Sequence, residues 1–100
     1  MKQDKEQTKV IFRKFYPEEG GDVIAIFPEL AGTFNPLITC LSYQHIGQHG
    51  SIFIPYDFFT FPATEEEYAP LKQELESLGY NLRVCKRMSR KDLQSRLEQV

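Results

Sequence analysis

Apolar residues in the first third of the chain follow the spacing of paired strands. Residues 8–15 (TKVIFRKF) are rich in β-branched and aromatic side chains and lead into a turn cluster that contains Gly20 and Gly21. Residues 23–27 (VIAIF) form a continuous apolar run of strand length, which is typical of a strand buried on both faces of a sheet. We therefore expect a hairpin whose second segment is a central strand.

A third strand is predicted over residues 38–44 (ITCLSYQ), after a loop over 28–37 that contains proline, glycine and asparagine. Because side chains alternate along a strand, Thr39, Leu41 and Tyr43 would share one face of the sheet. The residues between them would face the opposite way.

The next two segments give weaker signals. Residues 45–50 (HIGQHG) hold two glycines in six positions, which is too many for the interior of a regular element, so we expect a loop. Residues 51–61 (SIFIPYDFFTF) are strand-like in composition, but Pro55 lacks the N–H that a sheet ladder needs. This second segment is interpreted as an edge strand, a bulged strand or an ordered loop.

A helix is predicted after residue 64. Thr64 and Glu67 have the spacing of a capping box, and Gly79 stands where a left-handed residue would end the helix. Pro70 predicts either a kinked first turn or a regular helix that restarts at that point. The apolar stripe of this helix consists of Tyr68, Leu71, Leu75 and Leu78.

The C-terminal part adds one strand and one helix. Residues 81–87 alternate apolar and polar positions, which indicates a half-buried strand that returns beside the sheet. Residues 89–97 predict a short helix capped by Ser89, loosely docked because Leu93 and Leu97 are its only apolar anchors. The whole pattern predicts an α+β domain of two layers, in which an antiparallel sheet of about four strands carries the main helix and the short C-terminal helix on one face.

Composition is that of a globular domain, with 41% hydrophobic and 26% charged residues. We expect residues 1–100 to form one domain, with residues 1–7 flexible. No apolar run is long enough to cross a bilayer and none follows the N-terminus as in a signal peptide, so a cytoplasmic protein without a membrane partner is predicted. Cys40 and Cys85 lack zinc or thioredoxin spacing and are interpreted as reduced core residues, with a disulfide or a reactive thiol as the alternative.

Charge is unevenly distributed, although the net charge is only −2. Residues 1–16 carry a net charge of +3 and residues 83–100 carry +4, whereas residues 17–82 carry −9. Such a pattern can mark an anionic partner. It fits equally well a fold whose basic ends close onto its acidic centre, or a solvated face, and we favour these two interpretations.

The densest polar cluster lies at 42–50 (SYQHIGQHG) and holds both histidines of the chain. Its glycines let the backbone approach a ligand closely. We interpret the segment as a surface that contacts a ligand or a partner, and the alternative is that its side chains bond the loop's own backbone at a sheet corner. The candidate contact residues are Ser42, Tyr43, Gln44, His45, Gln48 and His49.

Two kinds of chemistry stay open for the histidines. His45 and His49 are the candidate ligands of a metal, although the glycines argue against a helix and no glutamate follows His45 as in a zincin. Nucleophilic catalysis would need a serine or cysteine held near an imidazole, but no nucleophile elbow is present. We therefore lean against an enzyme and predict neither a catalytic residue nor a cofactor. The candidates for a third metal ligand are Asp57, Cys40 and Glu29.

A nucleic-acid interface is the third hypothesis. Five of the thirteen aromatic residues fall between positions 53 and 61, where they would stack on bases. The simpler interpretation is that they seal the core beneath the helix stripe or form a dimer interface. A sequence pI of about 5.7 makes nucleic acid the least favoured partner. The basic residues of such an interface would be Arg83, Lys86, Arg87, Arg90 and Lys91.

Two segments carry a resemblance to a known group of sequences. SYQHIGQHG at 42–50 and FPATEEEYAPLKQELESLGYNLRVCKR at 61–87 resemble short uncharacterised proteins of bacteria and their phages, which share an S-Y-x-H-x-G-Q-H loop and a P-A-T-x-E-E-Y helix start. The resemblance spans Val10 to Arg87 and departs in the aromatic stretch 52–59, where similar sequences are more polar. It implies no activity, but it implies that the loop motif is recurrent.

The leading hypothesis is a small accessory or interaction module whose contact surface is the 42–50 loop. Its partner would be a protein or a small ligand, and a homodimer joined through an edge strand is a further option. The alternatives are a metal-binding protein or hydrolase-type enzyme that uses His45 and His49, and weak nucleic-acid binding through residues 83–91.

Overall fold

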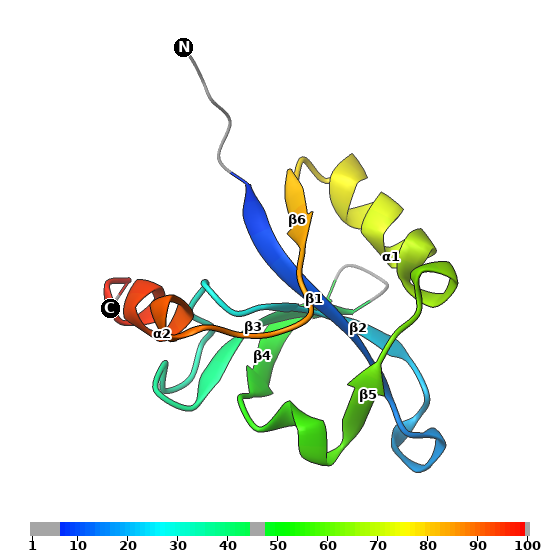
Figure 1. The fold of residues 1–100 in the computed structure, drawn as a ribbon, viewed down its shortest axis with the longest axis horizontal. Coiled ribbons are helices and arrows are strands. Elements are labelled where there is room, and N and C mark those ends of the chain that lie inside the picture. Colours follow the sequence, from blue (N-terminus) through cyan, green and yellow to red (C-terminus); the bar gives the residue numbers. More distant parts are fainter. Residues whose placement is uncertain (1–6, 45–47, 100) are drawn as a thin grey trace.

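The computed structural model describes residues 7–44 and 48–99, and Figure 1 shows their arrangement. The expected flexibility of the N-terminus therefore falls almost wholly on residues outside these ranges. No helix within them is both long and apolar enough to span a membrane. The strands are β1 (Thr8–Phe15), β2 (Val23–Phe27), β3 (Thr39–Gln44), β4 (Gln48–Phe53), β5 (Thr60–Pro62) and β6 (Leu82–Val84). The helices are α1 (Glu65–Ser77) and α2 (Arg90–Leu97), with the 3-10 turns η1 (Pro17–Glu19) and η2 (Tyr56–Phe58).

The predicted hairpin and its central strand are confirmed. β1 pairs antiparallel with β2, and β3 flanks β2 on its other side, which gives the order β4-β3-β2-β1-β5. Residues 24–27 of β2 are buried, as a continuous apolar run requires. The chain reverses between β1 and β2 through Gly20 and Gly21, whose φ values of 111° and 74° favour glycine.

The sheet is mixed, which corrects the expectation of a wholly antiparallel one. β6 pairs parallel with the first half of β1, with Thr8 opposite Leu82. β5 pairs antiparallel with the second half of β1, with Phe15 opposite Thr60. A parallel pair needs a long connection between its strands. The strand that pairs with the first half of β1 therefore comes from far along the chain. Two short strands thus share the outer edge of β1, and the strand predicted over 81–87 shortens to β6.

The two faces of the sheet carry separate apolar clusters. One face packs against α1 through Phe12, Phe27 and Tyr43, which contact Leu71 and Leu75 of the helix. The cluster on the opposite face consists of Ile11, Ile24, Ile26, Cys40, Ile52 and Tyr56. Tyr43 and Cys40 therefore lie on different faces of β3, as the alternation of the sequence predicts.

The two helices lie on opposite faces, so the prediction of a single helical layer is wrong. Val10 belongs to the cluster beneath α1, and the preceding residue, Lys9, points to the other face. There the Lys9 Nζ atom lies 2.9 Å from Asp92 Oδ2 of α2, and both side chains are buried. Figure 1 shows α2 at the end of the sheet away from α1. One helix therefore packs on each face of the sheet.

Polar groups hold α2 in place, which corrects the expected anchoring by Leu93 and Leu97. Both leucines are exposed, whereas Arg96 is only 3% exposed. Arg96 donates from Nε to the carbonyl oxygen of Pro36 at 2.9 Å and from Nη1 to that of Pro28 at 2.6 Å. Charged donors that satisfy buried carbonyls fix a helix more firmly than its apolar pattern suggests. The docking is therefore specific rather than loose.

α1 begins and ends as predicted. Thr64 Oγ1 accepts from the N–H of Glu67 at 3.2 Å, and Glu67 Oε1 accepts from the N–H of Thr64 at 2.9 Å, which is a complete capping box. Gly79 follows the helix at φ 106°. The helix runs through Pro70 instead of restarting there. Its buried stripe is shorter than predicted, because Leu78 is 57% exposed.

Two aromatic residues of the segment after β4, Tyr56 and Phe59, lie on the sheet face opposite α1, which corrects the expectation that these residues seal the core beneath the helix. Tyr56 is buried in that second cluster, and Phe59 packs against it. Phe53 and Phe58 are exposed. The segment that left three options open is thus an edge strand as far as Phe53, then η2, then the short strand β5.

Candidate functional site

The predicted contact residues divide between the two faces of the sheet. Tyr43 and His49 are cross-strand neighbours, and their rings meet edge to face with centroids 4.7 Å apart on the α1 side. Ser42 and Gln44 alternate with Tyr43 along β3 and therefore face the other way. One continuous polar stretch of sequence thus supplies two different surfaces.

The predicted loop is shorter than the sequence suggests. Gln48 and His49 belong to β4, and Gln48 lies opposite Gln44 in the backbone register. Gly50 also lies in the strand, outside the left-handed region, so its freedom is not used for a turn. His45 lies outside the described residues, as do positions 46 and 47. The prediction that glycines keep the whole segment out of regular structure is therefore wrong for residues 48–50.

A hydrogen-bonded group surrounds His49 on the α1 side. Its Nε2 atom lies 2.9 Å from the hydroxyl oxygen of Tyr80. The hydroxyl group of Tyr43 donates to Glu74 Oε2 of α1. Burial raises the pKa of Tyr80 above its ordinary value of 10, so its hydroxyl group is protonated and can donate at neutral pH. This group ties β4 to the C-terminal end of α1.

The described side chains do not assemble a metal centre. Within residues 7–44 and 48–99, no three His, Cys, Asp or Glu side chains come close enough to hold an ion. Burial raises the pKa of Cys40 to about 12, so this thiol stays protonated. Asp57 and Glu29, the other candidate third ligands, lie within ion-pair distance of Arg13 and Arg83, at 3.2 Å and 3.6 Å. The hypothesis that pairs His45 with His49 falls on a residue outside the described ranges.

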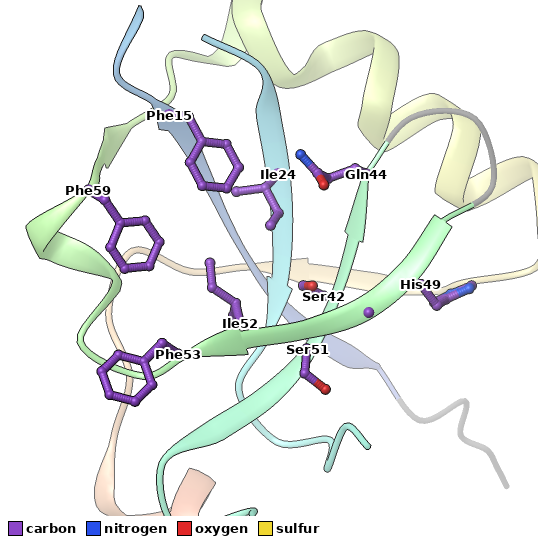
Figure 2. A pocket seen from close by; sticks show the side chains of 10 residues that line it. Phe15, Ile24, Ser42, Gln44, His49, Ser51, Ile52, Phe53 and Phe59 are labelled. Carbon is purple, nitrogen blue, oxygen red and sulfur yellow. The ribbon is translucent and has the colours of Figure 1, made fainter. Parts of the chain in front are cut away.

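The face opposite α1 carries a hollow of about 290 Å³ beside β4. Figure 2 shows Phe15, Ile24 and Gln44 gathered on one side of this strand, whereas the side chain of His49 points away. Ser42 lies at the base of the hollow and is 5% exposed. The remaining lining comes from residues 49–53 and Phe59. The lining combines five apolar side chains with polar ones, and none of its residues is Lys, Arg, Asp or Glu.

β4 is an edge strand, because β3 is its one neighbour in the described sheet. The N–H of Ile54 donates to the carbonyl oxygen of Ile38 at 2.7 Å. Since facing pairs in an antiparallel ladder alternate, residues 48, 50 and 52 bond to β3, and the backbone groups of His49, Ser51 and Phe53 point outward. No backbone hydrogen bond to these outward groups occurs among the described residues.

The predicted nucleic-acid residues have no common arrangement. Arg83 is within 3.6 Å of Glu29 Oε2 and donates from Nη1 to Cys85 Sγ at 3.2 Å. Lys86 and Arg87 line a second hollow together with Arg13, which was not predicted. The remaining two, Arg90 and Lys91, are exposed in the first turn of α2.

Sequence reasoning missed Tyr80 and Arg13. Tyr80 follows the helix-ending glycine, where a hydrophobic residue is expected for packing alone. Arg13 directly follows the apolar run of residues 10–12 in β1, and that break was the available signal. Both residues depend on partners that are distant in sequence, so no local spacing identifies them.

No protein-family model matches the chain, and the searches of curated proteins and of solved structures gave no match. The resemblance stated above stays a prediction.

Proposed function

We propose that this chain is a protein-interaction module that self-associates by strand addition along β4. The observation that carries the proposal is an edge strand of six residues whose outward backbone groups have no partner among the described residues. An unpaired strand edge is a template for another strand, because it offers a row of unused donors and acceptors.

The edge lacks the features by which proteins usually block such pairing. β4 reads QHGSIF, without lysine, proline or any formally charged residue at neutral pH. Phe53 is 49% exposed at its end. A second copy would bring the same uncharged strand, so the pairing meets no repulsion between like charges.

The outward groups select one register. A two-fold axis at Ser51 pairs Ser51 with itself and His49 with Phe53 of the other copy, so that all three outward residues form hydrogen-bonded pairs. The same register places Gly50 opposite Ile52 of the other copy. A glycine there leaves room for the isoleucine beside the hollow.

A charge exchange at two positions tests this register. The variant His49→Lys with Phe53→Lys places lysine opposite lysine, whereas His49→Lys with Phe53→Glu places lysine opposite glutamate. We expect the first to weaken the dimer about tenfold or more and the second to stay within about threefold of the unmodified protein. Sedimentation equilibrium over a range of protein concentrations measures the dimer dissociation constant of each variant.

The two variants are matched, because both replace the same side chains and both lose the His49–Tyr80 contact. An unmodified protein that stays monomeric at several hundred micromolar would refute self-association. Equal weakening in both variants would refute the register.

A further inference from the structure

A second hollow, of about 540 Å³, lies on the face opposite α1 between η2, β5 and the segment after β6. Arg13, Lys86 and Arg87 bring three positive charges to its lining, and Asp57 brings one negative charge. Ile54 and Met88 contribute apolar side chains to the lining. The hollow is thus positively charged in a protein whose net charge is −2.

Arg13 is held rigidly at this hollow. Its Nε atom donates to Thr60 Oγ1 at 3.0 Å, and its Nη2 atom donates to the carbonyl oxygen of Thr60 at 2.8 Å. The guanidinium carbon lies 5.1 Å from the centre of the Tyr56 ring. The side chain is 11% exposed. A guanidinium fixed in this way loses little conformational entropy when it binds an anion.

The carboxylate of Asp57 now occupies the position beside Arg13 that a bound anion would take. Asp57 Oδ1 lies 3.2 Å from Arg13 Nη2, and its side chain is 79% exposed. Because the Asp57 carboxylate is open to solvent, water screens its attraction to Arg13, and a better acceptor can replace it. Elsewhere in the described part of the chain, neither Lys86 nor Arg87 forms an ion pair. Two further cations are therefore free to approach the same ligand.

We propose that this hollow binds the phosphoryl group of a small phosphate monoester. A dianion would balance the net charge of the lining and offer three oxygen acceptors to the guanidinium and ammonium donors. The organic part of the monoester would lie against Ile54 and Met88. This site is separate from the β4 edge and does not depend on self-association.

Titration followed by ¹H–¹⁵N correlation spectra tests the proposal, with phenyl phosphate and inorganic phosphate as probes. We expect saturable shifts at Arg13 Nε and at the amides of residues 57 and 86–88. Phenyl phosphate should bind about threefold or more tighter than inorganic phosphate, because its ring gains apolar contact.

Matched variants separate this site from general surface charge. Lys86→Gln with Arg87→Gln should weaken phenyl phosphate binding about tenfold, whereas Arg90→Gln with Lys91→Gln removes the same charge outside the hollow and should change it less than about twofold. Asp57→Asn should tighten binding about threefold, because it removes the competing carboxylate.

Three results would overturn the proposal. One is the absence of saturable shifts, and another is equal weakening in the two double variants. The third is a short oligothymidylate that binds far more tightly than phenyl phosphate and loses affinity in both double variants, since that would indicate an extended polyanion surface.

Discussion

At the scale of single residues, Lys9 and Asp92 are buried opposite charges that join β1 to α2. Lys9 is 6% exposed and Asp92 is 1% exposed. Asp92 Oδ2 also accepts from the N–H of Ser89 at 2.7 Å, so one carboxylate caps the helix and neutralises the lysine. Removing it would leave a charged ammonium group without its partner in the interior.

Asp92→Ala should therefore lower the free energy of unfolding by about 3–5 kcal/mol. Glu76→Ala, which breaks the exposed pair with Lys72, should cost about 0.5 kcal/mol or less. Adding Lys9→Met to Asp92→Ala should restore part of the loss, because the uncompensated charge is removed. Urea unfolding measures all three, and equal costs for Asp92→Ala and Glu76→Ala would contradict this account.

The two cysteines, both free, differ in chemistry because of their surroundings. Burial raises the pKa of Cys40 to about 12, an effect that nearby Arg96 reduces and Asp92 increases. Cys85 is only half-buried. The prediction that both thiols are core residues is thus confirmed for Cys40 alone.

Iodoacetamide should accordingly modify Cys85 in the folded protein and leave Cys40 unmodified until the chain unfolds, because the thiolate is the reactive form. Peptide mass spectrometry after a time course distinguishes the two sites. Similar rates at both cysteines under native conditions would show that Cys40 is accessible.

At the scale of elements, the sequence pattern predicted the helices and strands that are determined by residues close to them in the chain. The β1–β2 hairpin and α1 carry turn glycines, a capping box and a continuous apolar run, and each signal lies within a few residues of its effect. The face on which α2 packs depends instead on Lys9, and the strand state of residues 48–50 depends on pairing with β3. Both features depend on contacts with residues distant in the sequence, so the local sequence pattern could not predict them.

The sequence predicted which residues belong to the candidate site, but not how they divide between the two faces of the sheet. The sequence directed attention to residues 42–50, and the edge strand and its hollow are there. Treating the stretch as a loop concealed the alternation that separates Tyr43 from Ser42 and Gln44. Arg13 acquires its setting from Thr60 and Tyr56, which no spacing rule brings together.

Glu67 gives α1 a pH dependence. The hydrogen bond from Lys14 Nζ, at 2.8 Å, and the bond from the backbone N–H of Thr64 lower the pKa of Glu67 from 4.5 to about 2. A carboxylate whose pKa is lowered by folding stabilises the fold above its unfolded pKa. That stability is lost as the pH falls from about 4.5 through about 2.

Glu67→Gln should thus lower the urea midpoint at pH 7 and flatten the loss of stability between about pH 4.5 and pH 2. Glu65→Gln in the same helical turn is the control, because Glu65 has no lysine partner in the described structure, and it should keep the steep dependence. Parallel slopes for Glu67→Gln and the unmodified protein would contradict the assignment.

At the scale of the whole molecule, the uneven charge distribution matches the contacts between distant segments. Arg13 pairs with Asp57, Lys14 with Glu67, and Arg83 with Glu29. Each pair joins a basic terminal segment to the acidic centre of the chain. This agrees with the preferred interpretation of the charge pattern, in which the ends close onto the middle. Within the described residues, Lys86 and Arg87 beside the 540 Å³ hollow form no such pair.

The divided outer edge of β1 has a consequence for biosynthesis. The hairpin with β2 can form early on the ribosome, but the strand that pairs with Thr8 and Val10 is translated much later. Lys9, beside them, meets its counter-ion only when Asp92 has emerged. The nascent chain therefore keeps its first strand half unpaired through most of translation, and its native state should arise in a late, cooperative step.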